Sequence, residues 1–147
     1  MKLTTFTDYC LRVLIYVAAA PTGRATIAQI ARDFGISENH LVKVAHLLGR
    51  EGLLLNTRGR GGGLALARPA KQINVGAVVR LAEGRDHPAE CFGEDNHCSI
   101  APVCRLAGVF EEALGAFYTV LDRHTLEDLL HNRARIVSIL RMHPRAA

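Results

Sequence analysis

Two short amphipathic segments separated by a tight turn restrict the fold of this chain most strongly. The first, residues 26–35, places Thr26 and Gln29 three positions apart, as in a helix capping box, and it ends with a glycine. The second, residues 38–52, follows Ser37, a residue type that commonly caps helices. Two such helices joined by Phe-Gly-Ile-Ser predict a helix-turn-helix, although an ordinary helical hairpin would have the same pattern.

The segment that follows favours the helix-turn-helix. Residues 53–69 contain two short β-prone runs around a glycine-rich turn, which predicts a β-hairpin. A helix-turn-helix followed directly by a basic hairpin is a winged helix. We expect Arg58 and Arg60 at the tip of this wing, where the glycines allow the backbone to approach a phosphate closely.

The other patterns predict a mainly α protein. Residues 6–20, 73–84 and 124–140 have the spacing of amphipathic helices, the last of them with a cap at its start. Residues 106–121 repeat apolar side chains at nearly heptad spacing. We therefore expect a winged helix-turn-helix with a small β-hairpin wing, followed by a long C-terminal helix that forms the seam of a homodimer.

Charge divides the chain into two halves. Residues 1–71 carry ten Lys and Arg against four Asp and Glu, whereas residues 72–147 carry eight against ten. A basic module beside a mildly acidic one is typical of a nucleic-acid-binding domain joined to a second function. We expect a winged-helix DNA-binding domain at 1–70. Residues 71–147 are expected to contain dimerisation helices and a loop whose cysteines, described below, bind an iron–sulfur cluster.

The N-terminal segment does not match a secretion signal, because Asp8 and Arg12 interrupt its apolar residues. No stretch approaches the roughly 20 apolar residues that a membrane span requires. We therefore expect no membrane association and a cytoplasmic location, where thiols stay reduced.

Three of the four cysteines lie close together in the sequence. Cys91, Cys98 and Cys104 follow the pattern C-x6-C-x5-C within the Gly- and Pro-containing stretch 89–108. Disulfides are disfavoured by a reducing compartment and by the odd number, and a structural zinc site usually has C-x2-C pairs. Core burial does not suit three cysteines in a polar loop. The pattern favours an iron–sulfur cluster, for which thiolates are the preferred ligands.

Three thiolates leave one coordination position for a fourth ligand. The candidates are Cys10, Asp8, His87, His97 or a small exogenous molecule. Residues 8 and 10 lie about 200° apart around a helix, so only one of them can face the cluster. Cys10 shares the apolar stripe of the first helix. A carboxylate is displaced more easily than a thiolate, which favours sensing over electron transfer.

Four stretches together resemble the NsrR-type nitric-oxide-sensing repressors, a family related to the iron–sulfur regulator IscR. They are "MKLTTFTDYCLRVLIYVA", "HLVKVAHLL", "RGRGGGLALARP" and "CRLAG…FYTVLD…TLEDLL", and the resemblance extends from residue 1 to about residue 130. It implies a homodimeric winged-helix repressor with one 2Fe-2S or 4Fe-4S cluster per subunit. Such a dimer would bind palindromic double-stranded DNA and release it when nitric oxide reacts with the iron.

The resemblance also implies a ligand set. Cys91, Cys98 and Cys104 match the three cysteine ligands of the family, and Asp8 matches its carboxylate ligand, donated either within the subunit or across the dimer. IscR-like members have a histidine three residues beyond the last cysteine, whereas this chain has Ala107. This difference argues against an IscR-type site.

The expected DNA-binding surface combines the second helix of the helix-turn-helix with the wing. Asn39, His40 and Lys43 share the outward face of that helix, and Asn and Lys can contact base edges. The arginines are expected to bind phosphates or the minor groove. The full set of expected DNA-binding residues is Arg12, Ser37, Asn39, His40, Lys43, Arg58 and Arg60.

Two other functions fit part of the pattern. A DNA-binding regulator could sense iron or redox state through a cluster or directly through its thiols. An iron–sulfur electron carrier could use the cysteines, but it would have no use for a basic wing. No substrate-binding constellation is present in the sequence, so we expect no enzyme activity.

Overall fold

The computed structural model describes residues 2–57, 59, 62–84, 89 and 96–140. In this part of the chain no helix is both long enough and apolar enough to cross a membrane. The described elements are, in order, α1 (Thr5–Ala19), α2 (Ile27–Phe34), α3 (Glu38–Arg50), β1 (Leu54–Thr57), β2 (Gly63–Leu66), η1 (Ala70–Gln72), α4 (Val75–Glu83), η3 (Ala101–Val103), α5 (Leu106–Asp122), η4 (Asp128–Leu130) and α6 (Arg133–Ile139).

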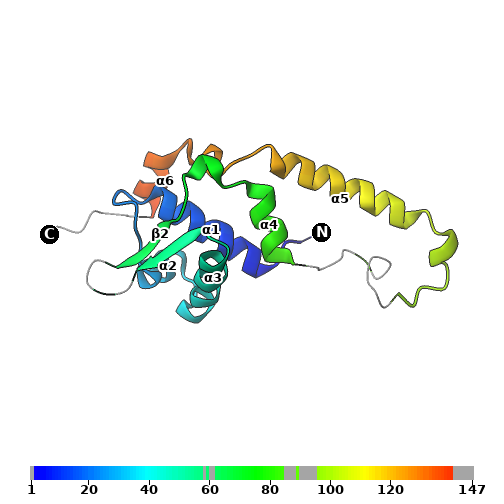
Figure 1. The fold of residues 1–147 in the computed structure, drawn as a ribbon, viewed down its shortest axis with the longest axis horizontal. Helices are drawn as coiled ribbons and strands as arrows, with labels where there is room; N and C mark the ends of the chain where they lie inside the picture. Colours follow the sequence, from blue (N-terminus) through cyan, green and yellow to red (C-terminus); the bar gives the residue numbers. More distant parts are fainter. Residues whose placement is uncertain (1, 58, 60–61, 85–88, 90–95, 141–147) are drawn as a thin grey trace.

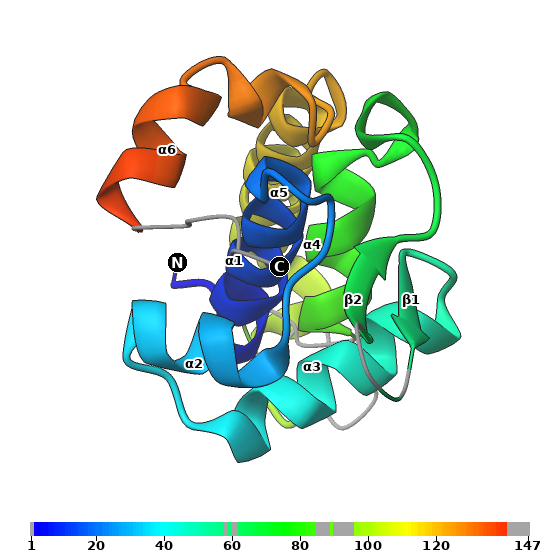
Figure 2. The same ribbon diagram turned by 90° about the vertical axis from the view of Figure 1, so that its left-hand side faces the viewer.

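Helix α1 forms the centre of the molecule. The Thr4 side chain caps it by accepting a hydrogen bond from the Thr7 backbone N–H. Its apolar stripe is fully buried and contacts α3, α4, β2 and α6. Figure 2 shows α1 surrounded by these elements. The core therefore unites residues from both halves of the sequence, among them Leu14, Ile73 and Leu126.

Helices α2 and α3 form the predicted helix-turn-helix. Both hydrogen bonds of the predicted Thr26–Gln29 capping box are present, and Gly35 ends α2 with a φ of 65°. Ser37 occupies the position before α3, but its side chain makes no capping hydrogen bond there. Its backbone carbonyl instead accepts hydrogen bonds from the N–H groups of the first turn.

Strands β1 and β2 form the predicted antiparallel hairpin, with a register from Leu54 opposite Leu66 to Thr57 opposite Gly63. A third segment joins it, because Ala25 and Leu64 exchange backbone hydrogen bonds of 3.0 and 2.7 Å. Ala25 lies directly before Thr26, the N-cap of α2. The wing is therefore attached by its backbone to the helix-turn-helix, while Arg58 and Arg60 lie outside the described residues.

Helix α5 extends away from the rest of the molecule, which it meets at its C-terminal end through α4 (Figure 1). The prediction of one helix over 124–140 is wrong. The Leu126 N–H donates to the Ile73 carbonyl at 2.8 Å and the Val75 N–H donates to the His124 carbonyl at 2.9 Å. These bonds place Thr125 in an antiparallel bridge with Asn74, and a 3-10 turn and the separate helix α6 follow it.

The bridge between the wing and the segment before α2 predicts that alanine is not tolerated at Gly63. This glycine has a φ of 147°, and a Cβ there would lie 2.8 Å from the Ala25 carbonyl oxygen. We expect Gly63→Ala to lower the free energy of unfolding by about 3 kcal/mol, from backbone strain and steric overlap together. Urea unfolding followed by circular dichroism measures this loss.

Gly23→Ala is the matched control, because Gly23 also has a positive φ of 67° but open space around its Cβ position. It should cost only the backbone strain of about 1–2 kcal/mol. Equal losses in the two variants would show that the close approach to Ala25 contributes nothing.

Candidate DNA-binding and metal-binding sites

The outward face of α3 carries the residues predicted to read DNA. Leu41, Val44 and Leu48 are buried on the inner face and fix the rotation of the helix. Asn39 and Lys43 consequently lie on the opposite, exposed face. Ser37 and His40, which were also predicted to bind DNA, are exposed as well, so all four predicted residues in and beside α3 are accessible.

The sequence analysis missed three further residues on this exposed surface. They are Val42, His46 and Arg50, which follow Asn39 at helical spacing. Val42 is 52 % exposed. Extending the helical period from Asn39 along the whole of α3 would have found all three.

Asp8 and Arg12 form an ion pair on the exposed side of α1. Arg12 Nε donates to Asp8 Oδ1 at 3.0 Å, and its Nη2 lies 2.9 Å from Oδ2. The two side chains remain 46 % and 43 % exposed. The Arg12 guanidinium also lies 5.6 Å from the centre of the Phe34 ring, at the end of α2. Arg12 therefore contacts both the candidate ligand and the helix-turn-helix.

Two more contacts join α1 to the helix-turn-helix. The Tyr9 ring, next to Asp8 in the chain, lies 6.1 Å from the His40 ring of α3. The Tyr16 hydroxyl donates a 2.6 Å hydrogen bond to Asp33 of α2, and burial with this bond raises the pKa of Tyr16 above its ordinary value. Helix α1 thus contacts both helices of the motif through side chains that the sequence analysis did not single out.

The candidate metal ligands are only partly described. Cys98 is exposed and Cys104 partly exposed at the end of η3, and both are free thiols. Cys91 and His87 lie outside the described residues, and His97 is exposed. Among the residues that the structure describes, no three His, Cys, Asp or Glu side chains are close enough to hold a metal ion. The proposed ligand set therefore remains a prediction.

Cys10 differs from the other cysteines because it lies in the core of the molecule. It is fully buried in the apolar stripe of α1. Burial raises the pKa of its thiol to about 12, since the apolar surroundings disfavour the thiolate. A metal ligand must be a thiolate, so this environment supports the interpretation of Cys10 as a core residue.

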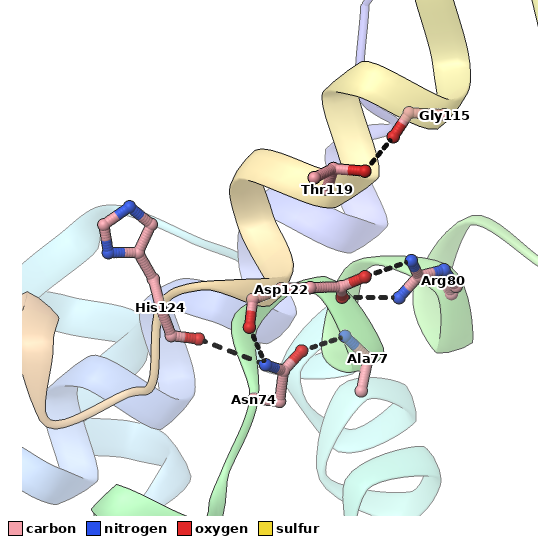
Figure 3. Close-up of polar contacts among 7 residues, drawn as sticks. All are labelled: Asn74, Ala77, Arg80, Gly115, Thr119, Asp122 and His124. Carbon is pink, nitrogen blue, oxygen red and sulfur yellow. Dashed lines mark hydrogen bonds and ion pairs between the residues drawn. The ribbon is translucent and has the colours of Figure 1, made fainter. Parts of the chain in front are cut away.

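A polar joint connects α5 to α4 (Figure 3). Arg80 of α4 binds both carboxylate oxygens of Asp122, at 2.7 and 2.6 Å, and lies 4.4 Å over the Tyr118 ring. The Asn74 side chain caps α4 and donates to the Asp122 carbonyl at 2.7 Å. Gly76 makes this approach feasible, because a Cβ there would overlap the Asp122 carboxylate. The joint fixes the direction in which α5 leaves the molecule.

Burial of Cys10 predicts selective labelling of the thiols. At pH 7.5 the native protein should react with iodoacetamide at Cys98, whereas Cys10 should stay unmodified because it is shielded and almost wholly protonated. Peptide mass spectrometry measures the labelled fraction of each, and urea-unfolded protein, in which Cys10 becomes reactive, is the control. Equal labelling rates in the native state would contradict the buried position of Cys10.

The joint predicts a pH dependence. Hydrogen bonds from Arg80 hold the pKa of Asp122 below its ordinary 3.8, so the pair stabilises the fold above that pH and is lost as the pH falls through the lowered value. Arg80→Gln should return the pKa of Asp122 toward 3.8, measured by NMR of the carboxyl carbons. Asp128, whose pKa is lowered by hydrogen bonds from Thr125, is the internal control and should not change. An unchanged Asp122 titration would contradict the assigned pair.

Comparison with known proteins places these features in one family. The model of the Rrf2 family, described as an iron-dependent transcriptional regulator, matches residues 3–132. The HTH-type transcriptional regulator NsrR of Bacillus subtilis is 48 % identical, over 97 % of this chain and 99 % of its own. NsrR of Halalkalibacterium halodurans is 44 % identical, over 98 % of this chain and its full length.

Solved structures agree with the sequence relatives. T. potens IscR matches with a TM-score of 0.72 and 27 % identity, covering 90 % of this chain and 88 % of that one. The oxidised form of Staphylococcus aureus CymR matches with a TM-score of 0.70 and 26 % identity, covering 89 % and 97 %. The predicted winged helix-turn-helix is thereby confirmed. The chain belongs to the Rrf2 family and is an NsrR-type transcriptional regulator, not an enzyme.

Proposed function

We propose that this regulator is a nitric-oxide-sensing repressor whose homodimer binds a palindromic operator when it carries an iron–sulfur cluster. The observation that carries this proposal is the similarity to NsrR proteins over nearly the whole chain, together with the three closely spaced cysteines. The geometry of α1, α3 and α5 supports individual parts of it.

DNA binding is supported by the exposed face of α3 and by the attached wing. A helix of this kind can enter the major groove while the wing contacts the backbone. The excess of Lys and Arg in residues 1–71 provides the attraction to phosphate. We assign readout of bases to Asn39, His40 and Lys43, and contacts to the backbone or minor groove to Arg12, Arg58 and Arg60. Ser37 lies where the helix approaches the duplex.

The homodimer is supported by α5. None of its residues is buried within one chain, and Leu106, Val109 and Val120 are each more than half exposed. A second copy of the helix packed along this face would remove that apolar surface from water. Two winged helices would then read two half-sites, which accounts for a palindromic operator. In this proposal residues 1–70 bind DNA and residues 71–147 sense and dimerise.

The cluster would be held by Cys91, Cys98, Cys104 and Asp8. The accessible free thiols of Cys98 and Cys104 suit iron, and the exposed Asp8 carboxylate supplies a more weakly held oxygen ligand. The same donors could hold a 2Fe-2S or a 4Fe-4S cluster. When bound, it would supply iron with which nitric oxide reacts.

Asp8 also connects the ligand set to the DNA-binding surface. Both of its carboxylate oxygens contact Arg12, whose guanidinium lies against Phe34 of α2. Ligation by either oxygen would weaken one of these contacts and leave Arg12 freer to bind a phosphate. Tyr9 would transmit any shift at the start of α1 to His40 of α3.

A second candidate function uses the thiols directly. Cys98 is an exposed free thiol, as a redox sensor requires. Such a regulator would bind DNA equally well with and without iron and would respond to peroxide.

Reconstitution with iron and sulfide separates the two candidates. Using a duplex selected from a random library, fluorescence anisotropy should show the reconstituted protein binding about 5–150-fold more tightly than the metal-free protein, the range typical of allosteric coupling. A colourless protein that binds DNA equally well after reconstitution would favour the thiol sensor.

Asp8→Ala tests the fourth ligand. We expect weaker cluster retention or a weaker response to nitric oxide, measured by visible absorption, while the fold stays intact because an exposed i,i+4 pair contributes only about 0.3–0.5 kcal/mol. Arg12→Ala removes the same ion pair but keeps the carboxylate, so its spectrum should match that of the parent. Glu127→Ala, a change to an exposed carboxylate near the end of the chain, is the control. A parental spectrum and response in Asp8→Ala would contradict the ligand assignment.

A further inference from the structure

We propose that Val42 reads the 5-methyl group of a thymine in the major groove. This inference rests on the DNA-binding part of the proposed function and adds a specific base to it. Val42 is 52 % exposed and is the one large hydrophobic residue of α3, all of which the structure describes, that lies mainly in solvent.

The position of Val42 is fixed by the packing of its neighbours. Leu41 is 1 % exposed and Val44 is completely buried. Because these two side chains hold the inner face of α3 against the core, Val42 must point outward. One helical turn before it lies Asn39 and one turn after it lies His46, both exposed. Lys43 follows directly and is exposed as well. A single aliphatic group is thereby set among polar and cationic ones.

Helix stability gives no reason for valine at this position. A β-branched residue has lower helix propensity than Ala, Lys or Glu, since the preceding turn restricts its χ1 angle. At a buried site packing would compensate for this cost, but at a half-exposed site it does not. The side chain therefore lowers the stability of α3 slightly and leaves apolar surface in water. Contact with a binding partner would remove that apolar surface from water.

The chemistry of the major groove identifies the partner group. Among the base edges exposed there, thymine alone carries a methyl group, and aliphatic side chains contact it. The stiffness of valine means that little side-chain entropy is lost when the contact forms. Neighbouring Asn39 can hydrogen-bond to adenine and Lys43 to guanine, so this surface combines polar groups for base edges with one apolar group for the thymine methyl. A protein partner would instead require a wider apolar patch than one side chain.

A double-mutant cycle between protein and DNA tests the proposal. The full-length wild-type protein, reconstituted with iron and sulfide, selects a duplex of about 30 base pairs from a random library, long enough for two half-sites one helical turn apart. Each thymine is then replaced singly by deoxyuridine, which removes only the methyl group. At one thymine in each half-site, wild-type affinity should fall about fourfold, the effect of losing one buried methyl group.

Val42→Ala should bind the thymine duplex more weakly than wild type. Its affinity should not fall further when deoxyuridine replaces that thymine, so the deoxyuridine penalty, meaning this loss of affinity, should disappear. Val42→Ile keeps an aliphatic group there and should retain the penalty. Leu55→Ala, which removes an equally exposed aliphatic side chain from β1, should also retain it. Circular dichroism confirms that each variant is folded.

The outcomes separate this inference from the function on which it rests. If the wild type selects no duplex, the DNA-binding function itself fails, and this inference with it. If the wild type binds its duplex but no thymine is sensitive to removal of its methyl, the Val42 contact alone is wrong. A penalty that persists unchanged in Val42→Ala, or that disappears in Leu55→Ala, would equally overturn the assignment.

Discussion

The rest of the structure depends on the burial of one face of α1. Its fully buried side chains Cys10, Val13, Leu14 and Val17 hold the helix-turn-helix on one side and α4 with α6 on the other. Burial of the Val and Leu side chains contributes about 1.5–3 kcal/mol each relative to exposure, whereas a surface ion pair typically contributes about 0–1 kcal/mol. Elements that share no direct contact are therefore fixed relative to one another through this helix.

In the proposed function, the opposite side of the same helix carries the groups that connect sensing to DNA binding. Asp8, Tyr9 and Arg12 lie within its first two turns. Arg12 contacts α2 and Tyr9 contacts α3, while Asp8 is paired with Arg12. An exposed pair such as Asp8–Arg12 contributes about 0.3–0.5 kcal/mol, whereas reversing a two-state equilibrium from 1:99 to 99:1 takes about 5.5 kcal/mol. The ion pair alone cannot switch DNA affinity. In the proposed function, the cysteine-containing segment and the α5 seam must supply most of the free-energy difference between the DNA-binding and DNA-releasing states. The contacts of α1 then determine which parts of the helix-turn-helix respond.

Much of the fold followed from local pattern. The capping box at Thr26 and Gln29, the turn glycine Gly35 and the hairpin around the wing are determined by neighbouring residues, and all were predicted correctly. The non-helical segment at the start of 124–140 was not predicted, because it depends on hydrogen bonds from Leu126 to Ile73 and from Val75 to His124, which lie far apart in sequence. Side-chain capping by Ser37 was expected from its residue type alone, and that hydrogen bond is not formed.

Within the candidate site, the residues on one helix could be predicted from the sequence, whereas the contacts between helices could not. The outward residues Asn39 and Lys43 follow from the helical period, and the same period extended to the end of α3 reaches Val42, His46 and Arg50. The contacts of Tyr9 with His40 and of Arg12 with Phe34 join separate helices, so no local pattern predicts them. The predicted ligand set rests on the resemblance to NsrR, and one of its members, Cys91, lies outside the described residues.

In the proposed function, bound iron controls the affinity of this protein for DNA in response to nitric oxide. One titration tests it most directly: nitric oxide is added anaerobically to the protein–DNA complex while visible absorption and the anisotropy of the labelled duplex are recorded together. The account predicts that the absorption of the cluster changes and the duplex is released over the same range of nitric oxide added. Loss of the absorption with the duplex still bound, or release of the duplex with no change in absorption, would contradict it.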